Sequence, residues 1–174
     1  MNVVQELAAR TLLVILAAAV VQDFMDMKIS NRLILMGILF SLAFGLTTGG
    51  PKQVIYVLAN LSFPVIVLYL LYLLGVLGAG DIKLFSIIGG FTNFKLLISC
   101  MFFSFVAAAV IAVCKMLYNR NFCGSLLRAG TYFRSLRQEG IVSYHKEWAE
   151  HRNLMHFSVA ILIGYIAAVA VQVL

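Results

Sequence analysis

Long apolar runs with almost no charged residues occupy most of this 174-residue chain. Hydrophobic residues make up 63% of the sequence and charged residues only 11%, whereas about a quarter of a typical soluble domain is charged. An apolar stretch of about 20 residues is long enough to cross a bilayer as a helix. The chain is therefore predicted to be an all-α, polytopic membrane protein, with one membrane-embedded domain over residues 1–174.

Six apolar segments are predicted to be transmembrane helices, and the fourth is the shortest. A helix of its length rises about 20 Å, less than the roughly 30 Å of the hydrocarbon core. The first segment is interpreted as a retained span rather than a signal peptide, because no small-x-small cleavage site follows it. Pro64 is expected to kink the third segment. The six segments cover residues 3–21, 29–48, 54–77, 82–94, 96–116 and 154–174.

The one long polar stretch, residues 118–153, contains apolar residues at helical spacing. This spacing predicts an amphipathic helix that lies on the inner leaflet or packs as a cytoplasmic helix with one solvated face. Both interpretations place the stretch between the fifth and sixth segments, on the cytoplasmic side. The apolar residues are Phe122, Leu126, Ala129, Phe133 and Leu136.

The positions of lysine and arginine predict the topology, because cytoplasmic loops of membrane proteins carry an excess of both residues. Ten of the 13 basic residues follow the first, third and fifth segments. These loops are expected in the cytoplasm, with both termini outside. The net charge of +6 is explained by this asymmetry, and no nucleic-acid partner is expected. The ten are Lys28, Arg32, Lys83, Lys115, Arg120, Arg128, Arg134, Arg137, Lys146 and Arg152; the other three are Arg10, Lys52 and Lys95.

Three of the seven acidic residues lie at the ends of apolar segments. Asp23 and Asp26 end the first segment, and Asp81 directly precedes the fourth. The charge count places all three toward the cytoplasm, and the short fourth segment suggests that Asp81 lies at membrane depth. An ionisable residue at such a depth is costly and is a functional hypothesis by default. The other four acids are Glu6, near the outer N-terminus, and Glu139, Glu147 and Glu150, in the polar stretch.

The tetrapeptide Gly78-Ala79-Gly80-Asp81 combines one of these acids with two glycines. Glycines at these positions permit a positive φ or a close approach of another chain segment. Two carboxylates from different helices, when brought together, share a proton and can act as acid and base on a peptide bond. The alternative is a purely structural role, in which Asp81 follows a loop turn and caps the start of a helix.

Three motifs in this chain resemble those of the type IV prepilin peptidases, a family of Gly-x-Gly-Asp aspartic peptidases. Residues 78–84, Gly-Ala-Gly-Asp-Ile-Lys-Leu, resemble the family's second active-site motif. The first motif has an Asp followed six residues later by Ile-Pro-Asn, and Asp23 stands at that spacing before Ile29-Ser30-Asn31. Residues 155–164 resemble the final-helix motif, usually Pro-Phe-x-Pro before a Gly. Ser30, His156 and Val159 replace family prolines, which puts substrate fit in doubt more than catalysis.

The resemblance implies an aspartic endopeptidase of the bacterial inner membrane, with Asp23 and Asp81 as its catalytic dyad. It would cleave the leader of prepilin or pseudopilin substrates at the cytoplasmic face, after a Gly that precedes a hydrophobic helix. Gly78, Gly80, Lys83 and Asn31 are expected to support the dyad. The chain looks like the short, peptidase-only subtype associated with Flp-type (tight-adherence) pili, so no methyltransferase activity is expected.

No cofactor is expected, because the three histidines lack a metal-ligand grouping and the three cysteines form no Cys-x-x-Cys pair. Three other functions remain open. Acids at membrane depth also mark ion pathways, so a small proton or ion carrier is one alternative. A presenilin-like intramembrane protease shares the Gly-x-Gly-Asp motif, and a catalytically silent assembly protein shares the fold. The spacing of the first motif favours the prepilin peptidase.

Overall fold

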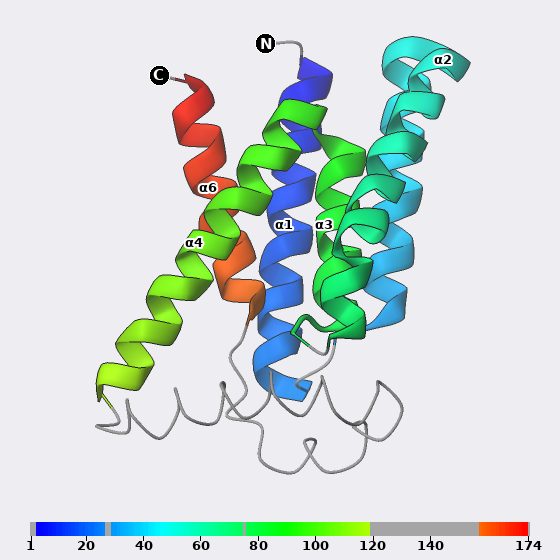
Figure 1. The fold of residues 1–174 in the computed structure, drawn as a ribbon. Helices are drawn as coiled ribbons and strands as arrows, with labels where there is room; N and C mark the ends of the chain where they lie inside the picture. Colours follow the sequence, from blue (N-terminus) through cyan, green and yellow to red (C-terminus); the bar gives the residue numbers. More distant parts are fainter. Residues whose placement is uncertain (1–2, 27–28, 75, 119–156, 174) are drawn as a thin grey trace. The chain divides into compact units, whose positions relative to one another are not determined.

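The structure, a computed structural model, describes residues 3–26, 29–74, 76–118 and 157–173. These residues form helices and no strand, so the prediction of an all-α protein is confirmed. Figure 1 shows the helices in chain order. They are α1 (Val3–Asp26), α2 (Asn31–Leu73), α3 (Ala79–Phe91), α4 (Phe94–Tyr118) and α6 (Phe157–Val173).

Contacts divide the chain into two compact units. The first contains residues 1–107 and 156–174, and the second contains residues 108–155. Every residue predicted for the active site belongs to the first unit. Of the second unit the structure describes only the end of α4. The predicted amphipathic stretch, apart from Tyr118, and His156 lie outside the described residues.

Three of the described helices, α1, α2 and α4, are long and apolar enough to cross a membrane. The remaining two are shorter: α6 has 17 residues and α3 has 13. The short fourth segment of the sequence is therefore found as a short helix, but it begins three residues earlier than predicted. As a result, Asp81 lies inside the first turn of α3 rather than before the helix.

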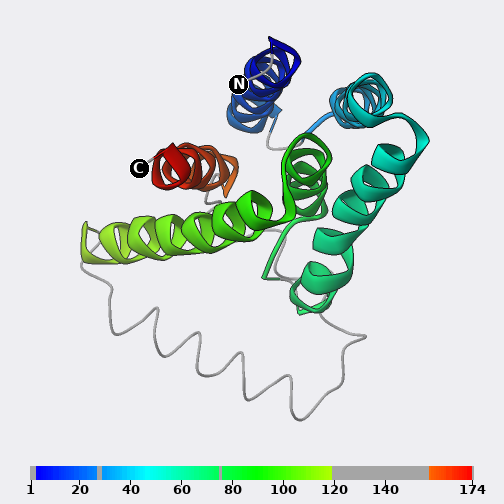
Figure 2. The ribbon, with the colours of Figure 1, turned by 90° about the horizontal axis from the view of Figure 1, so that it is seen from above.

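The 43-residue helix α2 is two helices joined at a break. Gly50 adopts φ 63° and ψ −155°, a conformation that is accessible essentially only to glycine, and Pro51 follows it. Gly45 lies against Val57 across the break, so the chain turns back on itself (Figure 2). The predicted segments 29–48 and 54–77 are the two limbs of α2. The break at Gly50 lies in the gap predicted between these two segments, and the kink predicted at Pro64, inside the second limb, stays a prediction.

Helix α3 is buried on nearly all sides. It packs against both limbs of α2 and also contacts α1 and α6. Between Ile82 and Gly90 every residue is buried except Lys83, which is exposed. A helix that is apolar all round is stable only when other apolar elements enclose it. The core of the first unit therefore forms around α3.

Glycines allow the backbones of α2 and α3 to approach closely. A Cβ added to Gly89 would overlap the main-chain oxygen of Asn60, and one added to Gly90 would lie 2.6 Å from Ser41 Oγ. Asn60 Nδ2 also donates a hydrogen bond to Thr92 O at 3.2 Å. Small residues permit such contacts between helices in membrane proteins. These contacts fix α3 between the two limbs of α2.

Substituting Gly89 with alanine is expected to destabilise the protein, because the main-chain oxygen of Asn60 cannot move away as a side chain can. The expected loss is about 1–3 kcal/mol, the usual cost of overpacking a core. Gly37→Ala is the matched control, because the three atoms nearest to a Cβ there belong to the Ile87 side chain and not to the main chain, the nearest of them at 2.9 Å. Thermal unfolding in detergent measures both variants. Equal unfolding temperatures would contradict the close packing of α2 and α3.

Candidate active site

The two acids predicted as a catalytic pair lie at opposite ends of their respective helices. Asp23 is in the last turn of α1, and Asp81 is in the first turn of α3. Both residues are partly buried. The helix dipole favours an anion at a helix N-terminus and disfavours one at a C-terminus. Asp81 therefore gains support from its own helix, whereas a charged Asp23 requires support from another part of the chain.

The segment that follows Asp23 reaches the start of α3. A Cβ added to Gly80 would lie 3.2 Å from Ile29 Cδ1, so Gly80 accommodates the Ile29 side chain next to Asp81. Lys83 Nζ donates a hydrogen bond to Asn31 Oδ1 at 2.9 Å. The first and second sequence motifs, which are about 50 residues apart along the chain, are therefore in direct contact.

The turn between α1 and α2 is held by a polar contact within the first motif. The main-chain N–H of Ser30 donates to Gln22 Oε1 at 3.0 Å, and Ser30 caps α2 by accepting from the N–H of Arg32. Ser30 stands where the family has proline. A proline has no N–H to donate, so the contact with Gln22 is available to this chain because of the replacement.

The third motif also contacts the first. Ser158, the second residue of α6, donates a hydrogen bond from Oγ to Asp23 Oδ2 at 2.6 Å. Three rings secure the start of α6 against α3 and α4: the centroid of Phe157 lies 6.3 Å from Phe85 and 5.9 Å from Phe105. Phe85 and Phe105 are themselves 6.2 Å apart. This aromatic cluster places Ser158 beside the end of α1.

The Gly-x-Gly-Asp tetrapeptide forms the N-terminal cap of α3. The N–H of Gly78 donates to Asp81 Oδ2 at 3.3 Å, so the capping interpretation of Asp81 is correct for this contact. Asp81 can cap the helix and still take part in a reaction, since a carboxylate oxygen has more than one lone pair. Positive φ is not the reason for these glycines, because Gly78 has φ −78° and Gly80 is helical. The close approach of Ile29 explains Gly80.

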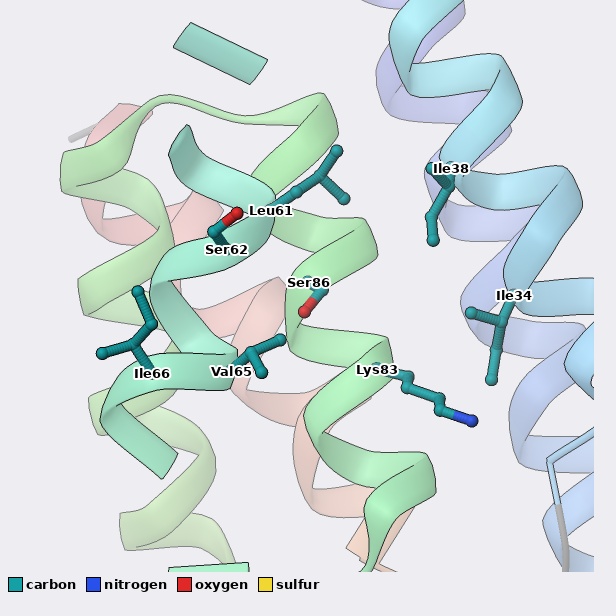
Figure 3. Close-up of a pocket in the computed structure, with 8 residues that line it drawn as sticks. All are labelled: Ile34, Ile38, Leu61, Ser62, Val65, Ile66, Lys83 and Ser86. Atoms are coloured by element: carbon teal, nitrogen blue, oxygen red, sulfur yellow. The ribbon is translucent and has the colours of Figure 1, made fainter. Parts of the chain in front are cut away.

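An apolar groove of about 570 Å³ runs between the two limbs of α2 and along α3 (Figure 3). Its polar groups are few. Ser62 and Ser86 donate their hydroxyl protons to main-chain oxygens of their own helices. Lys83, two residues after Asp81, lies at the groove with its ammonium group directed away from α3. The lining residues are Ile34, Ile38, Leu61, Ser62, Val65, Ile66, Lys83 and Ser86.

These contacts link Asn31 to Lys83 and Ile29 to Gly80, while Asp23 is bound by Ser158 and Asp81 by Gly78. Asp26, the other acid at the end of α1, is exposed. Within the described part of the chain, no three His, Cys, Asp or Glu residues group as metal ligands.

Two further residues of the site, Ser158 and Gln22, were not predicted. Ser158 occupies the variable position of the final-helix motif, and only its polarity in an otherwise apolar helix indicated that it needs a partner. Gln22 offered no signal apart from its place next to Asp23.

A model of the type IV leader peptidase family matches residues 11–113, which is more than half of the chain. The matched region contains the first two motifs and the α2 groove, and it ends before α6. No curated protein and no solved structure shows a significant match.

A disulfide is expected to form in the double variant Ile29→Cys/Gly80→Cys. The Cβ position of Gly80 lies 3.6 Å from Ile29 Cβ, and disulfides join Cβ atoms about 3.5–4.5 Å apart. The native Cys100, Cys114 and Cys123 are first replaced by alanine. Loss of free thiols after mild oxidation, counted by alkylation and mass spectrometry, measures the bond.

Ile29→Cys/Gly78→Cys is the matched control, because no atom of Ile29 lies within 4 Å of a Cβ at Gly78. Slower or absent oxidation is expected in the control. Equal oxidation of the two pairs would contradict the specific contact between the first and second motifs.

Proposed function

Because the chain belongs to the type IV leader peptidase family, we propose that it cleaves the leader from prepilin-like substrates with an aspartic dyad formed by Asp23 and Asp81. The family match supports a peptidase. The aspartic mechanism rests on the two acids themselves, which stand at the motif positions of the family.

The single observation that carries the proposal is the contact of all three motifs at one end of their helices. Ile29 contacts Gly80 beside Asp81, and Ser158 donates to Asp23. Residues that serve only helix packing have no need to gather polar groups at one place in an apolar protein. A carboxylate in each of two contacting motifs, with Lys83 in the second motif and Ser158 bound to Asp23, supports acid–base chemistry.

The proposed reaction uses the two carboxylates in different protonation states. A pair of carboxylates that works in this way divides the roles of base and acid between its members. The ionised member takes a proton from a water molecule, whose oxygen attacks the carbonyl carbon of the scissile bond. The protonated member donates to the carbonyl oxygen. Transfer of a proton to the leaving nitrogen then breaks the C–N bond, giving a carboxylate and a new amine.

The proposed membrane topology follows from the distribution of basic residues. Six spans, with the two limbs of α2 counted separately, place both termini outside the bacterial inner membrane. Asp23, Asp81 and Lys83 then face the cytoplasm, where the basic leader of the substrate remains. Two lysines of the opposite group support this arrangement: Lys52 lies just after the break in α2, and Lys95 lies at the start of α4.

The groove along α3 is proposed to hold the apolar residues that follow the cleavage point. It begins at Lys83, close to Asp81 in the chain, and its walls are almost entirely apolar. Each α2 wall extends over little more than one helical turn, about 5.4 Å. The groove therefore suits the first turn of an apolar helix.

The enzyme is assigned to the peptidase-only subtype that serves Flp-type pili, without methyltransferase activity.

Neutralising either acid of the dyad is expected to stop cleavage. Asp23→Asn and Asp81→Asn should each slow processing by about 100-fold or more, because positioned acids and bases contribute at least that much. A co-expressed candidate prepilin is followed by its size shift on a gel. Asp26→Asn is the control, since Asp26 is exposed and lies three residues from Asp23. If the two dyad variants process the prepilin at the normal rate, the dyad is wrong.

Filling the groove is expected to weaken substrate binding. Val65→Trp should raise KM by about tenfold, the usual size of an apolar-pocket effect, with little change in kcat. Val67→Trp is the matched control: Val65 and Val67 are 45% and 48% exposed on the same limb of α2, but only Val65 lines the groove. Equal KM values for the two variants in detergent would place the substrate elsewhere.

A further inference from the structure

Four serines are buried in the described part of the chain, and one of them differs in the acceptor to which its hydroxyl group donates. Ser41, Ser86 and Ser104 each donate to a main-chain oxygen three or four residues earlier in their own helix. This local bond is the usual way for a serine inside a helix to satisfy its hydroxyl group. Ser158 instead donates to the side chain of Asp23 on α1, a residue 135 positions away.

The position of Ser158 in its helix explains this difference. Ser158 is the second residue of α6, so no preceding turn of α6 offers a main-chain oxygen to its hydroxyl group. The residue is 1% exposed, so water does not satisfy it either. Asp23 provides an acceptor at 2.6 Å, a length typical of a hydroxyl bound to a carboxylate.

Asp23 in turn depends on this donor. It lies in the last turn of α1, where the helix dipole disfavours a negative charge. Ser158 supplies a proton donor, and the start of α6 supplies the favourable end of a second helix dipole. The other carboxylate oxygen, Oδ1, accepts no hydrogen bond from the residues that the structure describes. Within the described residues, Ser158 therefore holds one oxygen of Asp23 and the other has no hydrogen bond.

We propose that Ser158 is a positioning residue of the peptidase, which holds Asp23 Oδ2 so that Oδ1 faces the reacting groups. The inference rests on the proposed function and adds a third residue to its two acids. A bound carboxylate has a fixed side-chain rotamer, and fixed geometry favours a reaction that requires near-contact of the reacting atoms. Ser158 does not touch the substrate in this scheme, so it acts on turnover rather than on binding.

A simpler role for Ser158 is to attach α6 to α1, and the test must separate the two roles. Threonine and valine have the same shape, but only threonine keeps the hydroxyl group. Comparing Ser158→Thr with Ser158→Val therefore removes the proton donor while the added bulk stays constant. Purified variants are assayed for kcat and KM on a prepilin, and their thermal unfolding is measured in the same detergent.

The expected result is a kcat about tenfold or more lower for Ser158→Val than for Ser158→Thr, which matches the loss of a hydrogen bond to a charged group. KM should agree within about twofold and the unfolding temperatures within a few degrees, because the hydroxyl group contributes mainly to turnover. A lower kcat for the valine variant at an equal unfolding temperature is the readout that a purely structural role does not explain.

Two results would overturn the inference. Equal kcat values for the two variants, with Asp23→Asn inactive, would remove Ser158 from the mechanism and leave the proposed dyad intact. Unfolding of the valine variant alone would make the hydrogen bond a structural link between α1 and α6. Normal cleavage by Asp23→Asn would instead reject the dyad itself, so the two failures are distinguishable.

Discussion

The enclosure of α3 by the other helices of its unit determines where every residue of the proposed site lies. Helix α3 is short and apolar on nearly every side, so α1, both limbs of α2 and α6 pack around it. Backbone contact at Gly89 and Gly90 fixes its position along α2. Gly80, in the first turn of α3, then lies against Ile29, and Phe85, one turn later, lies near Phe157 at the start of α6. A longer α3 would shift that turn away from its neighbours.

The two acids are supported by different physical means. Asp81 lies at the favourable end of its own helix dipole and accepts the N–H of Gly78. Asp23 lies at the unfavourable end of α1 and receives its donor, Ser158, from a helix near the other end of the chain. Such an asymmetry suits a pair of carboxylates that take different roles, since their surroundings differ. The aromatic cluster of Phe85, Phe105 and Phe157 is what keeps α6 in place to provide that donor.

Much of the fold was predictable because an apolar helix leaves a strong signal in the sequence. Length and hydropathy predicted the helices and the short α3. The break in α2 at Gly50 lies in the gap predicted between segments 29–48 and 54–77, although the sequence did not show that Gly50 itself takes the non-helical conformation. A proline within a helix remains compatible with helical geometry, whereas the conformation of Gly50 is not. The sequence left two explanations for Gly80, a positive φ or the close approach of another chain segment. The contact with Ile29 supports the second explanation.

The sequence by itself determined the all-helical class, the membrane character and the family, because these depend on composition and on motifs with short internal spacing. It also led to the proposal of Asp23 and Asp81 as a catalytic pair, since each acid stands in such a motif. The local cap of Asp81 could be expected from the sequence, but the tertiary structure alone decided what Asp23 touches. Ser158 meets Asp23 across 135 residues, and Lys83 meets Asn31 across 52. Contacts of that kind depend on how buried helices pack, and no local pattern of residues encodes the pairing of two distant side chains.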